Sequence, residues 1–423
     1  MDTLILDQIA GIDFGTSNSS VGVFRNGSAE LLELRDEGRT IPSAIFYSSE
    51  SSETCFGRNA VAHYTQGAEG RLLRSLKSVL GTSLIKEKTL IRNKRVAFTD
   101  IIEDFFGFLK LQLDQQCGSE INSVVLGRPV RFVDDNDEKD REAESQLRGI
   151  AAAAGFKNIE FQYEPIAAAL NYENTLAKEE LVVIVDIGGG TADFSVLRLS
   201  PARHLQHNRS NDVLATMGMH IGGTDFDRLL SLHSVMPLLG LGSCVKGSSR
   251  KLPSSIYFDL ATWHRIPLLY NPSSLGLVRQ MRMEAQQADS VDALALVIEN
   301  RLGHALARSV ESAKIELSSL QCSSVRLDYA ASTLIDCAVS RTAMDASIEA
   351  AVGKLCACVN EGLAKAGVQA DDIVTVFYTG GSSSVPCLSA AFEQLLPRAT
   401  HKRGDVFGSV GLGLTIDAGR RFA

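Results

Sequence analysis

Two short segments of the chain place an aspartate just before a run of small residues, a pattern suited to binding phosphate. They are residues 11–18 (GIDFGTSN) and residues 185–191 (VDIGGGT). In each segment an apolar strand ends in Asp-x-Gly, small residues follow, and a β-rich stretch resumes, which predicts a β-hairpin. Small residues in such a turn leave backbone N–H groups free to bind phosphate oxygens. Two facing turns of this kind would clamp a polyphosphate.

The aspartates of the two segments, Asp13 and Asp186, end their predicted strands beside the turns. There they could hold the water shell of Mg²⁺, which prefers one or two carboxylates together with substrate phosphates. A single Asp-x-Gly motif also fits an ordinary turn. Two copies, together with a third glycine turn at residues 380–384 after a predicted strand at 373–378, favour nucleotide binding.

The glycine turns also exclude two common nucleotide folds. A Walker loop and a Rossmann turn both require a helix that begins at the glycines. After Gly15 and Gly188 the sequence returns to β-rich residues instead. Helical periodicity is found elsewhere, at residues 99–115 and 301–320, and a buried strand is predicted at 124–126. We therefore expect an α/β protein built on a duplicated lobe.

Composition narrows the class of protein further. The chain has 423 residues, of which 45% are hydrophobic and 22% are charged, as in globular proteins with two or three large units. Its 42 basic and 50 acidic residues give a net charge of −8, which disfavours binding to nucleic acid. We find no apolar run of membrane-spanning length and no signal peptide, and the eight scattered cysteines fit reduced thiols. We expect a cytoplasmic protein that does not bind membranes.

The chain resembles the actin, sugar-kinase and heat-shock ATPase superfamily, and within it the nucleotide-binding domain of DnaK-type heat-shock chaperones. The likeness spans nearly the whole sequence. It is carried by residues 11–21, 38–43, 163–169, 186–193, 221–227 and 380–382. The strings EPIAAA at 164–169 and GGTDFD at 222–227 are specific to the chaperone branch. Because the sequence ends without a substrate-binding half, it looks most like the short bacterial YegD-type members.

The resemblance implies an actin-like ATPase fold, with two duplicated lobes around a central nucleotide cleft. Lobe I would span residues 1–180, with its core at 1–43 and 119–180 and a peripheral subdomain at 44–118. Lobe II would span residues 181–423, with its core at 181–225 and 322–423 and a peripheral subdomain at 226–321. The implied cofactors are ATP or ADP with Mg²⁺, and K⁺ as an accompanying ion.

The resemblance also implies roles for individual residues at the phosphates. The residues expected to hold the phosphates are Gly15, Thr16, Ser17 and Asn18 on one side and Gly188, Gly189, Gly190 and Thr191 on the other. The metal would be held by Asp13 and Asp186. The expected catalytic residues are Lys77, Glu164, Asp193 and Thr191. Lys77 would orient the attacking water and neutralise charge on the γ-phosphate, and Asp193 would accept the proton.

The resemblance also implies further nucleotide-binding residues, which are Gly222 and Gly223 and, for the nucleoside, Glu311, Lys314, Ser318, Gly380, Gly381, Ser382 and Asp405. Glu311, Lys314 and Ser318 share one polar face of the predicted helix, which fits ribose binding or, alternatively, an exposed Glu–Lys pair. Where the family carries two arginines that sandwich adenine, this chain has Ile315 and Ser384. Each lost stack is worth roughly 0.5 to 2 kcal/mol, so adenine binding should weaken by about ten- to a thousandfold.

We therefore expect a chaperone-type ATPase that slowly hydrolyses Mg-ATP, lacks a substrate-binding domain and acts with client or co-chaperone proteins. Three alternatives remain from the sequence alone. The first is a small-molecule kinase or polyphosphatase of the same superfamily. The second is an actin-like assembly protein, and the third is a domain that binds nucleotide only as a structural brace.

Overall fold

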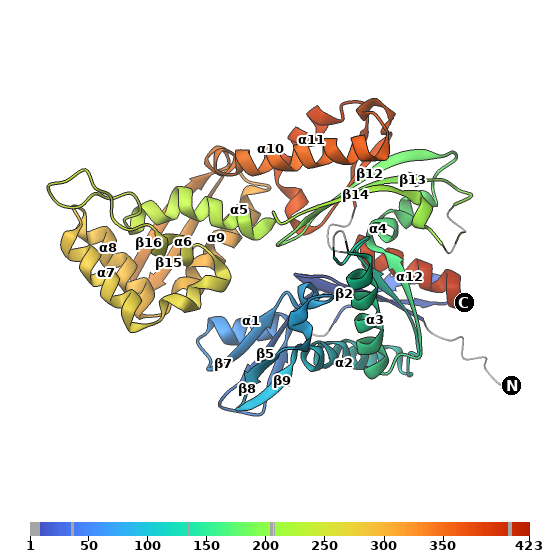
Figure 1. The fold of residues 1–423 in the computed structure, drawn as a ribbon, viewed down its shortest axis with the longest axis horizontal. Coiled ribbons are helices and arrows are strands. Elements are labelled where there is room, and N and C mark those ends of the chain that lie inside the picture. Colours follow the sequence, from blue (N-terminus) through green and yellow to red (C-terminus); the bar gives the residue numbers. More distant parts are fainter. Residues whose placement is uncertain are drawn as a thin grey trace. The chain divides into compact units, whose positions relative to one another are not determined.

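The computed structural model describes residues 9–34, 38–133, 136–203, 206, 208–330, 332–404 and 408–423. The chain forms two compact units. Unit 1 contains Met1–Met219, Cys358–Ser383 and Glu393–Ala423, and unit 2 contains His220–Ala357 and Ser384–Phe392. Each unit is described by itself below (Figure 1). The lobe boundaries expected from the sequence stay a prediction.

The first sheet of unit 1 has the order β11-β10-β1-β2-β3, and β4 (Ile41–Pro42) pairs beside β2. Its strands are β1 (Ile9–Phe14), β2 (Asn18–Arg25), β3 (Ser28–Leu31), β10 (Ser123–Arg128) and β11 (Asn158–Tyr163). β1 and β2 form an antiparallel hairpin, while β1, β10 and β11 run parallel. The residue pattern of β10 is buried along most of its length, as expected for a strand covered on both faces.

The second sheet of unit 1 repeats this topology with the order β14-β13-β12-β17-β18. Its strands are β12 (Glu180–Ile187), β13 (Ala192–Leu199), β14 (Val213–Met219), β17 (Thr375–Thr379) and β18 (Thr400–Arg403). The β12–β13–β14 meander is antiparallel and β12, β17 and β18 are parallel. Strand for strand, β12 therefore corresponds to β1, β13 to β2 and β17 to β10. The duplicated lobe core expected from the sequence is confirmed.

Helices α4 (Glu164–Glu173) and α12 (Ser409–Phe422) pack against each other inside unit 1. Their contact is backbone against backbone, because a Cβ atom placed on Gly413 would lie 1.9 Å from the carbonyl oxygen of Ala167. The apolar cluster at this contact joins the two helices to the first sheet through Ile9 and Val125. Small residues at this position thus let the helices approach closely.

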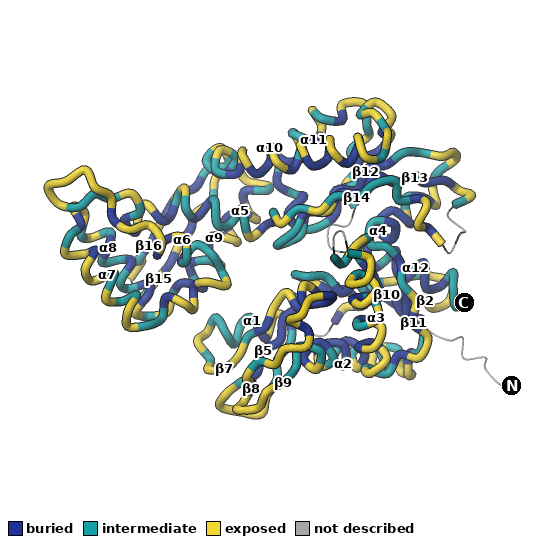
Figure 2. The backbone as a smooth tube through the Cα atoms, viewed as in Figure 1, coloured by how far each residue is buried: buried dark blue, intermediate teal, exposed yellow. Residues whose placement is uncertain are grey.

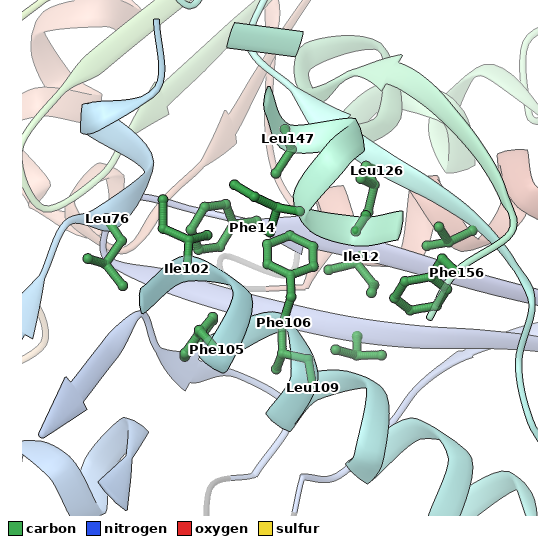
Figure 3. Close-up of a cluster of buried hydrophobic side chains, with 14 of the residues drawn as sticks. Ile12, Phe14, Leu76, Ile102, Phe105, Phe106, Leu109, Leu126, Leu147 and Phe156 are labelled. Atoms are coloured by element: carbon green, nitrogen blue, oxygen red, sulfur yellow. The ribbon is translucent and has the colours of Figure 1, made fainter. Parts of the chain in front are cut away.

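The largest apolar core of unit 1 lies between the first sheet and helices α2 (Phe98–Cys117) and α3 (Asp137–Ala153). Figure 3 shows its side chains, with Phe14 of β1 beside Phe105 and Phe106 of α2. The 3.6-residue period that predicted a helix at residues 99–115 places these apolar side chains on one face. Helix α2 ends at Gly118, whose φ of 67° is the left-handed value that favours glycine.

A smaller three-stranded sheet, with the order β6-β5-β7, is part of unit 1. Its strands are β5 (Ala44–Ser48), β6 (Thr54–Phe56) and β7 (Gly70–Arg74), and helix α1 (Gly57–Thr65) follows β6 directly. Two 3₁₀ helices (Leu76–Val79 and Ser83–Lys86) lead to a hairpin of β8 (Lys88–Ile91) and β9 (Lys94–Ala97). Figure 2 shows that the tip of this hairpin is exposed, whereas β5 is buried.

Unit 2 is mainly helical. Its helices are α5 (Gly223–Leu230), α6 (Ser255–Leu260), α7 (Pro272–Glu284), α8 (Ala288–Glu299) and α9 (Gly303–Leu317). A hairpin of β15 (Cys322–Tyr329) and β16 (Ser332–Ser340) packs on α9. Helices α10 (Arg341–Ala366) and α11 (Pro386–Leu395) have residues in both units. In the part of the chain that the structure describes, every helix is too short or too polar to cross a bilayer.

Candidate functional site

The two Asp-Gly segments form β-hairpin turns, as predicted. Asp13 near the end of β1 lies opposite Ser20 of β2, and Asp186 near the end of β12 lies opposite Asp193 of β13. The second turn is closed by a hydrogen bond from the Gly188 N–H to the Thr191 carbonyl oxygen, at 2.9 Å. Neither turn begins a helix, which confirms that the chain has no Walker or Rossmann loop at these glycines.

The two turns meet in unit 1. A Cβ atom added to Gly189 would lie 2.4 Å from the Ser17 Oγ, so the second turn closely approaches the first, and a side chain at Gly189 would require Ser17 to move. The third glycine turn joins them, since the Ser382 hydroxyl donates to the Gly188 carbonyl oxygen at 2.9 Å. A Cβ atom on Gly380 would lie 2.4 Å from the Asp186 carboxylate. All three glycine turns found in the sequence therefore lie together.

Ser43 fixes the first turn, a role that the sequence did not predict. Its hydroxyl donates to the Gly15 carbonyl oxygen at 2.6 Å, and its N–H donates to the Ser17 carbonyl oxygen at 2.9 Å. Ser19 and Ser43 also share a hydrogen bond of 2.8 Å between their hydroxyl groups. Ser43 belongs to the string at residues 38–43, which carries part of the family likeness. That string was the sequence signal from which the role of Ser43 could have been inferred.

Lys77 lies in the 3₁₀ helix Leu76–Val79 and is buried, and its ammonium group donates to the Glu164 carboxylate. Glu164 is the first residue of α4 and is part of the EPIAAA string. The ammonium group of Lys77 also interacts electrostatically with Asp13 and Asp193. The predicted catalytic lysine is thus held among the predicted metal and catalytic carboxylates instead of lying on the surface as an ordinary solubilising lysine.

The cluster contains more carboxyl groups than positive charges, and this excess contributes to raised pKa values of its aspartates. Burial, followed by repulsion from Glu164, raises the pKa of Asp13 to about 7. Burial, followed by the charges of Asp193, Glu164 and Asp13, raises the pKa of Asp186 to about 8. Burial acts to lower the pKa of Lys77, but the carboxylates of Glu164 and Asp13 outweigh burial and raise it. Four carboxyl groups therefore face one ammonium group.

This donor set fits Mg²⁺. The available ligand atoms are carboxylate oxygens, and Asp13 and Asp186 are recessed beside the two turns where phosphates would supply the remaining oxygens. A divalent cation would also offset the repulsion that raises the pKa of both aspartates.

The further nucleotide-binding residues predicted from the sequence fall into two groups. Gly380, Gly381 and Ser382 belong to unit 1, beside the phosphate turns. The others belong to unit 2 and comprise Gly222, Gly223, Glu311, Lys314 and Ser318. Asp405 lies outside the described residues.

In unit 2, Lys314 is buried and joins α9 to α5. Its ammonium group donates to the Gly223 carbonyl oxygen at 3.1 Å and to the Asp227 carboxylate at 2.9 Å. The alternative of an exposed Glu311–Lys314 pair is therefore wrong, because Lys314 pairs with Asp227 instead. Burial raises the pKa of Asp227 to about 6, although the charge of Lys314 opposes that shift. The GGTDFD string contains Asp227, but spacing alone gave no sign of this long-range pair.

The remaining predicted residues on α9 are more open to solvent. Glu311 is exposed, and the Ser318 hydroxyl bonds to the Lys314 carbonyl oxygen at 3.4 Å. Ile315, at the position of one missing arginine, has 61% of its surface exposed. An exposed isoleucine can offer a base only apolar contact, without the cation–π attraction of an arginine.

Two sheets of matching topology, with hairpin turns that meet beside a cluster of carboxylates, define the actin-like ATPase fold. The model of the family described as Hsp70 protein matches residues 9–238 and 276–419. The chain therefore belongs to the Hsp70 family, and the matched region corresponds to the ATPase domain of that family. Nucleotide-binding domains of this family bind ATP or ADP with Mg²⁺.

Curated relatives agree with this assignment. The chaperone protein DnaK of Ureaplasma urealyticum serovar 10 is 33% identical over 224 residues, which cover 52% of this chain and 34% of the relative. The chaperone protein DnaK of Thermosipho melanesiensis is 24% identical over 420 residues, which cover 97% of this chain and 59% of the relative. The chain thus spans no more than about three-fifths of the length of these relatives.

Proposed function

We propose that this chain binds Mg-ATP between the β1–β2 and β12–β13 turns and hydrolyses it slowly, as a chaperone-type ATPase. The observation that carries the proposal is the approach of Gly189 to Ser17 next to the Lys77–Glu164 pair. A turn with a purely structural role needs neither a second glycine turn against it nor a lysine–carboxylate pair beside it. Two turns of backbone N–H groups, a lysine and recessed carboxylates together supply what phosphoryl transfer to water requires.

The backbone of the two turns would hold the phosphates. N–H groups of Gly15, Thr16, Ser17 and Asn18 would bind from one side, and those of Gly188, Gly189, Gly190 and Thr191 from the other. Asp13 and Asp186 would hold Mg²⁺ through its water shell. The ion held by these two aspartates would supply positive charge that neutralises part of the phosphate charge.

Lys77 would stabilise the charge that develops on the γ-phosphate, and Glu164 keeps its ammonium group in place. Asp193 is the proton acceptor that the geometry favours. It is exposed, unlike recessed Asp13 and Asp186, so it can take a proton from the attacking water and return it to solvent. Thr191, which closes the second turn, would orient that water.

Nucleotide binding should be weak at the base. Ile315 and Ser384 replace the family's stacking arginines, and the Ile315 side chain is largely exposed on α9. The phosphates and Mg²⁺ would then supply most of the affinity. This loss also favours a second candidate function, in which bound nucleotide only braces the fold, and a turnover measurement separates the two.

The test combines isothermal titration with a phosphate-release assay, on the wild type, Lys77→Ala and Lys86→Ala. Lys86 is the matched control, because it is exposed in the next 3₁₀ helix and its ammonium group pairs with exposed Glu142, at 3.0 Å. Wild type and Lys86→Ala should bind and hydrolyse Mg-ATP. Lys77→Ala should bind it but lose roughly a hundredfold or more in turnover.

If all three variants bind with equal, negligible turnover, the bracing function holds and the ATPase proposal is wrong. If the wild type binds no nucleoside triphosphate, both functions fail. Product analysis with polyphosphate and small-molecule acceptors checks the kinase and polyphosphatase alternatives in the same samples.

A further inference from the structure

Outside the predicted nucleotide residues, a glutamate, a cysteine and a histidine converge on the small sheet of unit 1. Each of Glu53, Cys55 and His63 offers one ligand atom, and the three atoms lie within 4.8 Å of one another. The Cys55 Sγ is 3.7 Å from the Glu53 carboxylate oxygen. Two ligands at about 2.3 Å (sulfur) and 2.0 Å (oxygen) from a tetrahedral zinc ion would be separated by roughly this distance.

The local fold explains why these residues meet. Glu53 immediately precedes β6 and Cys55 lies within it, and because the two residues are two apart in extended chain their side chains lie on the same side. The chain then turns sharply at Gly57, whose φ of 61° favours glycine, and enters α1. The turn allows His63, in the last turn of α1, to reach the same point.

His63 is held in the tautomer that metal binding needs. Its Nδ1 bonds to the Asn59 carbonyl oxygen at 3.1 Å, and because a carbonyl only accepts, Nδ1 must carry the proton. The other ring nitrogen, Nε2, then keeps its lone pair. The ring is also stacked on Phe46, with centroids 6.1 Å apart and planes 9° from parallel. A carbonyl partner on the second nitrogen is the usual support of a metal-binding histidine.

The carboxylate of Glu53 is available as well. Arg92 contacts this segment, but its guanidinium donates to the main-chain carbonyl oxygens of Ser48 and Glu53, not to the carboxylate. The bond from the Cys55 thiol is the contact that the Glu53 carboxylate makes within the described part of the chain. Cys55 is 4% exposed and Glu53 is exposed, so an ion could enter from the solvent side.

We propose that Glu53, Cys55 and His63 form a binding site for a zinc-like divalent cation, with water as the fourth ligand. On binding, the sulfur–hydrogen bond of Cys55 breaks, a sulfur–metal bond forms, and the proton passes to solvent without any change of oxidation state. One thiolate and one carboxylate balance the two positive charges of the ion. The sulfur and imidazole ligands select zinc over Mg²⁺ and Ca²⁺, which prefer oxygen alone. The bound ion would fasten α1 to β6.

The test titrates Zn²⁺ into the chelator-treated full chain against a chromophoric chelator, without nucleotide or Mg²⁺. Variants are Cys55→Ser, His63→Gln and Glu53→Gln, and Cys322→Ser is the matched control because Cys322 is an exposed thiol in unit 2. The wild type and Cys322→Ser should take up one ion per chain. Each ligand variant should lose more than about a hundredfold in zinc affinity. A residue that only supports a ligand from outside would cost less, about ten- to a hundredfold.

Two further measurements keep the proposal falsifiable if Cys55→Ser folds poorly. Glu53 is exposed, so Glu53→Gln should keep the wild-type circular dichroism spectrum while losing the zinc-induced rise in melting temperature. Co²⁺ in place of Zn²⁺ should give a thiolate charge-transfer band that Cys322→Ser retains. The proposal is overturned if wild type binds no zinc, if Glu53→Gln and His63→Gln bind it as tightly as wild type, or if the cobalt band depends on Cys322.

Discussion

The β1–β2 and β12–β13 hairpins are two copies of one design, and two of the residue pairs in which they differ change the charge and the packing of the turn. Asp13 and Asp186 correspond, but Asp13 lies opposite Ser20 whereas Asp186 lies opposite Asp193. Two residues earlier, the first hairpin has a pair of glycines, Gly11 and Gly22, where the second has Ile184 and Ser195. The first difference changes the charge at the turn, and the second changes how closely a helix can approach.

The two differences between the hairpins have separate physical meanings, one chemical and one of packing. Asp193 gives the second hairpin a second carboxylate, which we propose as the proton acceptor, whereas the first hairpin has only Asp13 among these paired residues. In the first hairpin, helix α12 lies so close that a Cβ atom on Gly11 would be 2.3 Å from the Thr415 main-chain nitrogen. A Cβ atom on Gly22 would be 2.1 Å from the Thr415 hydroxyl. The comparison teaches that the features shared by the two hairpins, the aspartate and the small turn residues, are the ones that the proposed ligand requires, while the residue pair two positions earlier is set by packing.

The largest expected effect concerns the residues opposite the two aspartates. Asp193→Asn should lower the turnover of ATP by roughly a hundred- to ten-thousandfold, because the proton acceptor is lost. Ser20→Ala, the equivalent change in the first hairpin, should leave turnover near the wild-type value. Phosphate release under saturating Mg-ATP measures both. Equal losses in the two variants would mean that the hairpins are chemically equivalent.

The next largest effect is the loss of stability when one of the paired glycines, Gly11 or Gly22, is replaced by a larger residue. Gly11→Ala should destabilise the protein by about 3 kcal/mol, because the added methyl group meets main-chain atoms of Thr415 that cannot move aside. Gly353→Ala is the control, since a Cβ atom there meets nothing within 4 Å, inside helix α10; it should be neutral or stabilise by about 1 kcal/mol. Urea unfolding gives both values. A Gly11→Ala protein as stable as wild type would contradict the close approach of α12.

The pH dependence of stability should separate the two aspartates. In the unfolded chain an aspartate loses its proton near pH 3.8, whereas folded Asp186 keeps it to about 8 and Asp13 to about 7. The unfolded state therefore binds fewer protons between these values, so stability falls as pH rises from about 4 to 8.

Asn mimics the protonated acid, so Asp186→Asn should remove part of this fall and be more stable than wild type at pH 8. The difference should be on the order of a few kcal/mol in EDTA without nucleotide. Asp13→Asn should do the same to a smaller extent. Glu50→Gln, at an exposed position, should leave the pH profile unchanged. Chemical unfolding from about pH 4 to 8 measures the stability of the three variants. The prediction is wrong if the stability of Asp186→Asn falls with pH as steeply as that of the wild type.

The smallest expected effect is a loss of Mg-ATP affinity on substitution of a glycine in the β12–β13 turn. A Cβ atom on Gly190 meets nothing within 4 Å, so Gly190→Ala should fold with wild-type stability. It should nevertheless bind Mg-ATP about tenfold more weakly, since a methyl group would obstruct the approach of phosphate to the backbone. Gly149→Ala in α3, equally free of steric contacts, should bind normally. Isothermal titration decides, and equal affinities would place the phosphates away from the second turn.

Much of this site was predictable because its signals are local. An aspartate that ends a strand, followed by glycines, specifies a hairpin turn, and the same signal at Asp13 and Asp186 predicted two equivalent turns. Long-range contacts were harder to predict. Nothing in the spacing shows that Ser43 holds the first turn or that Lys314 reaches Asp227, because such pairs depend on how distant elements pack. The Glu53–Cys55–His63 cluster was missed because it depends on the turn at Gly57.

The order in which the strands appear in the sequence bears on how the protein is made. As a ribosome releases the chain, the first sheet has all its strands by Tyr163, but the second has only β12, β13 and β14 until the whole segment up to β17 has emerged. During that interval one edge of β12 has no partner strand, and an unpaired apolar edge promotes aggregation. Helix α12, which covers the paired glycines of the first hairpin, arrives last. The nascent chain is therefore most vulnerable between the synthesis of β14 and that of α12.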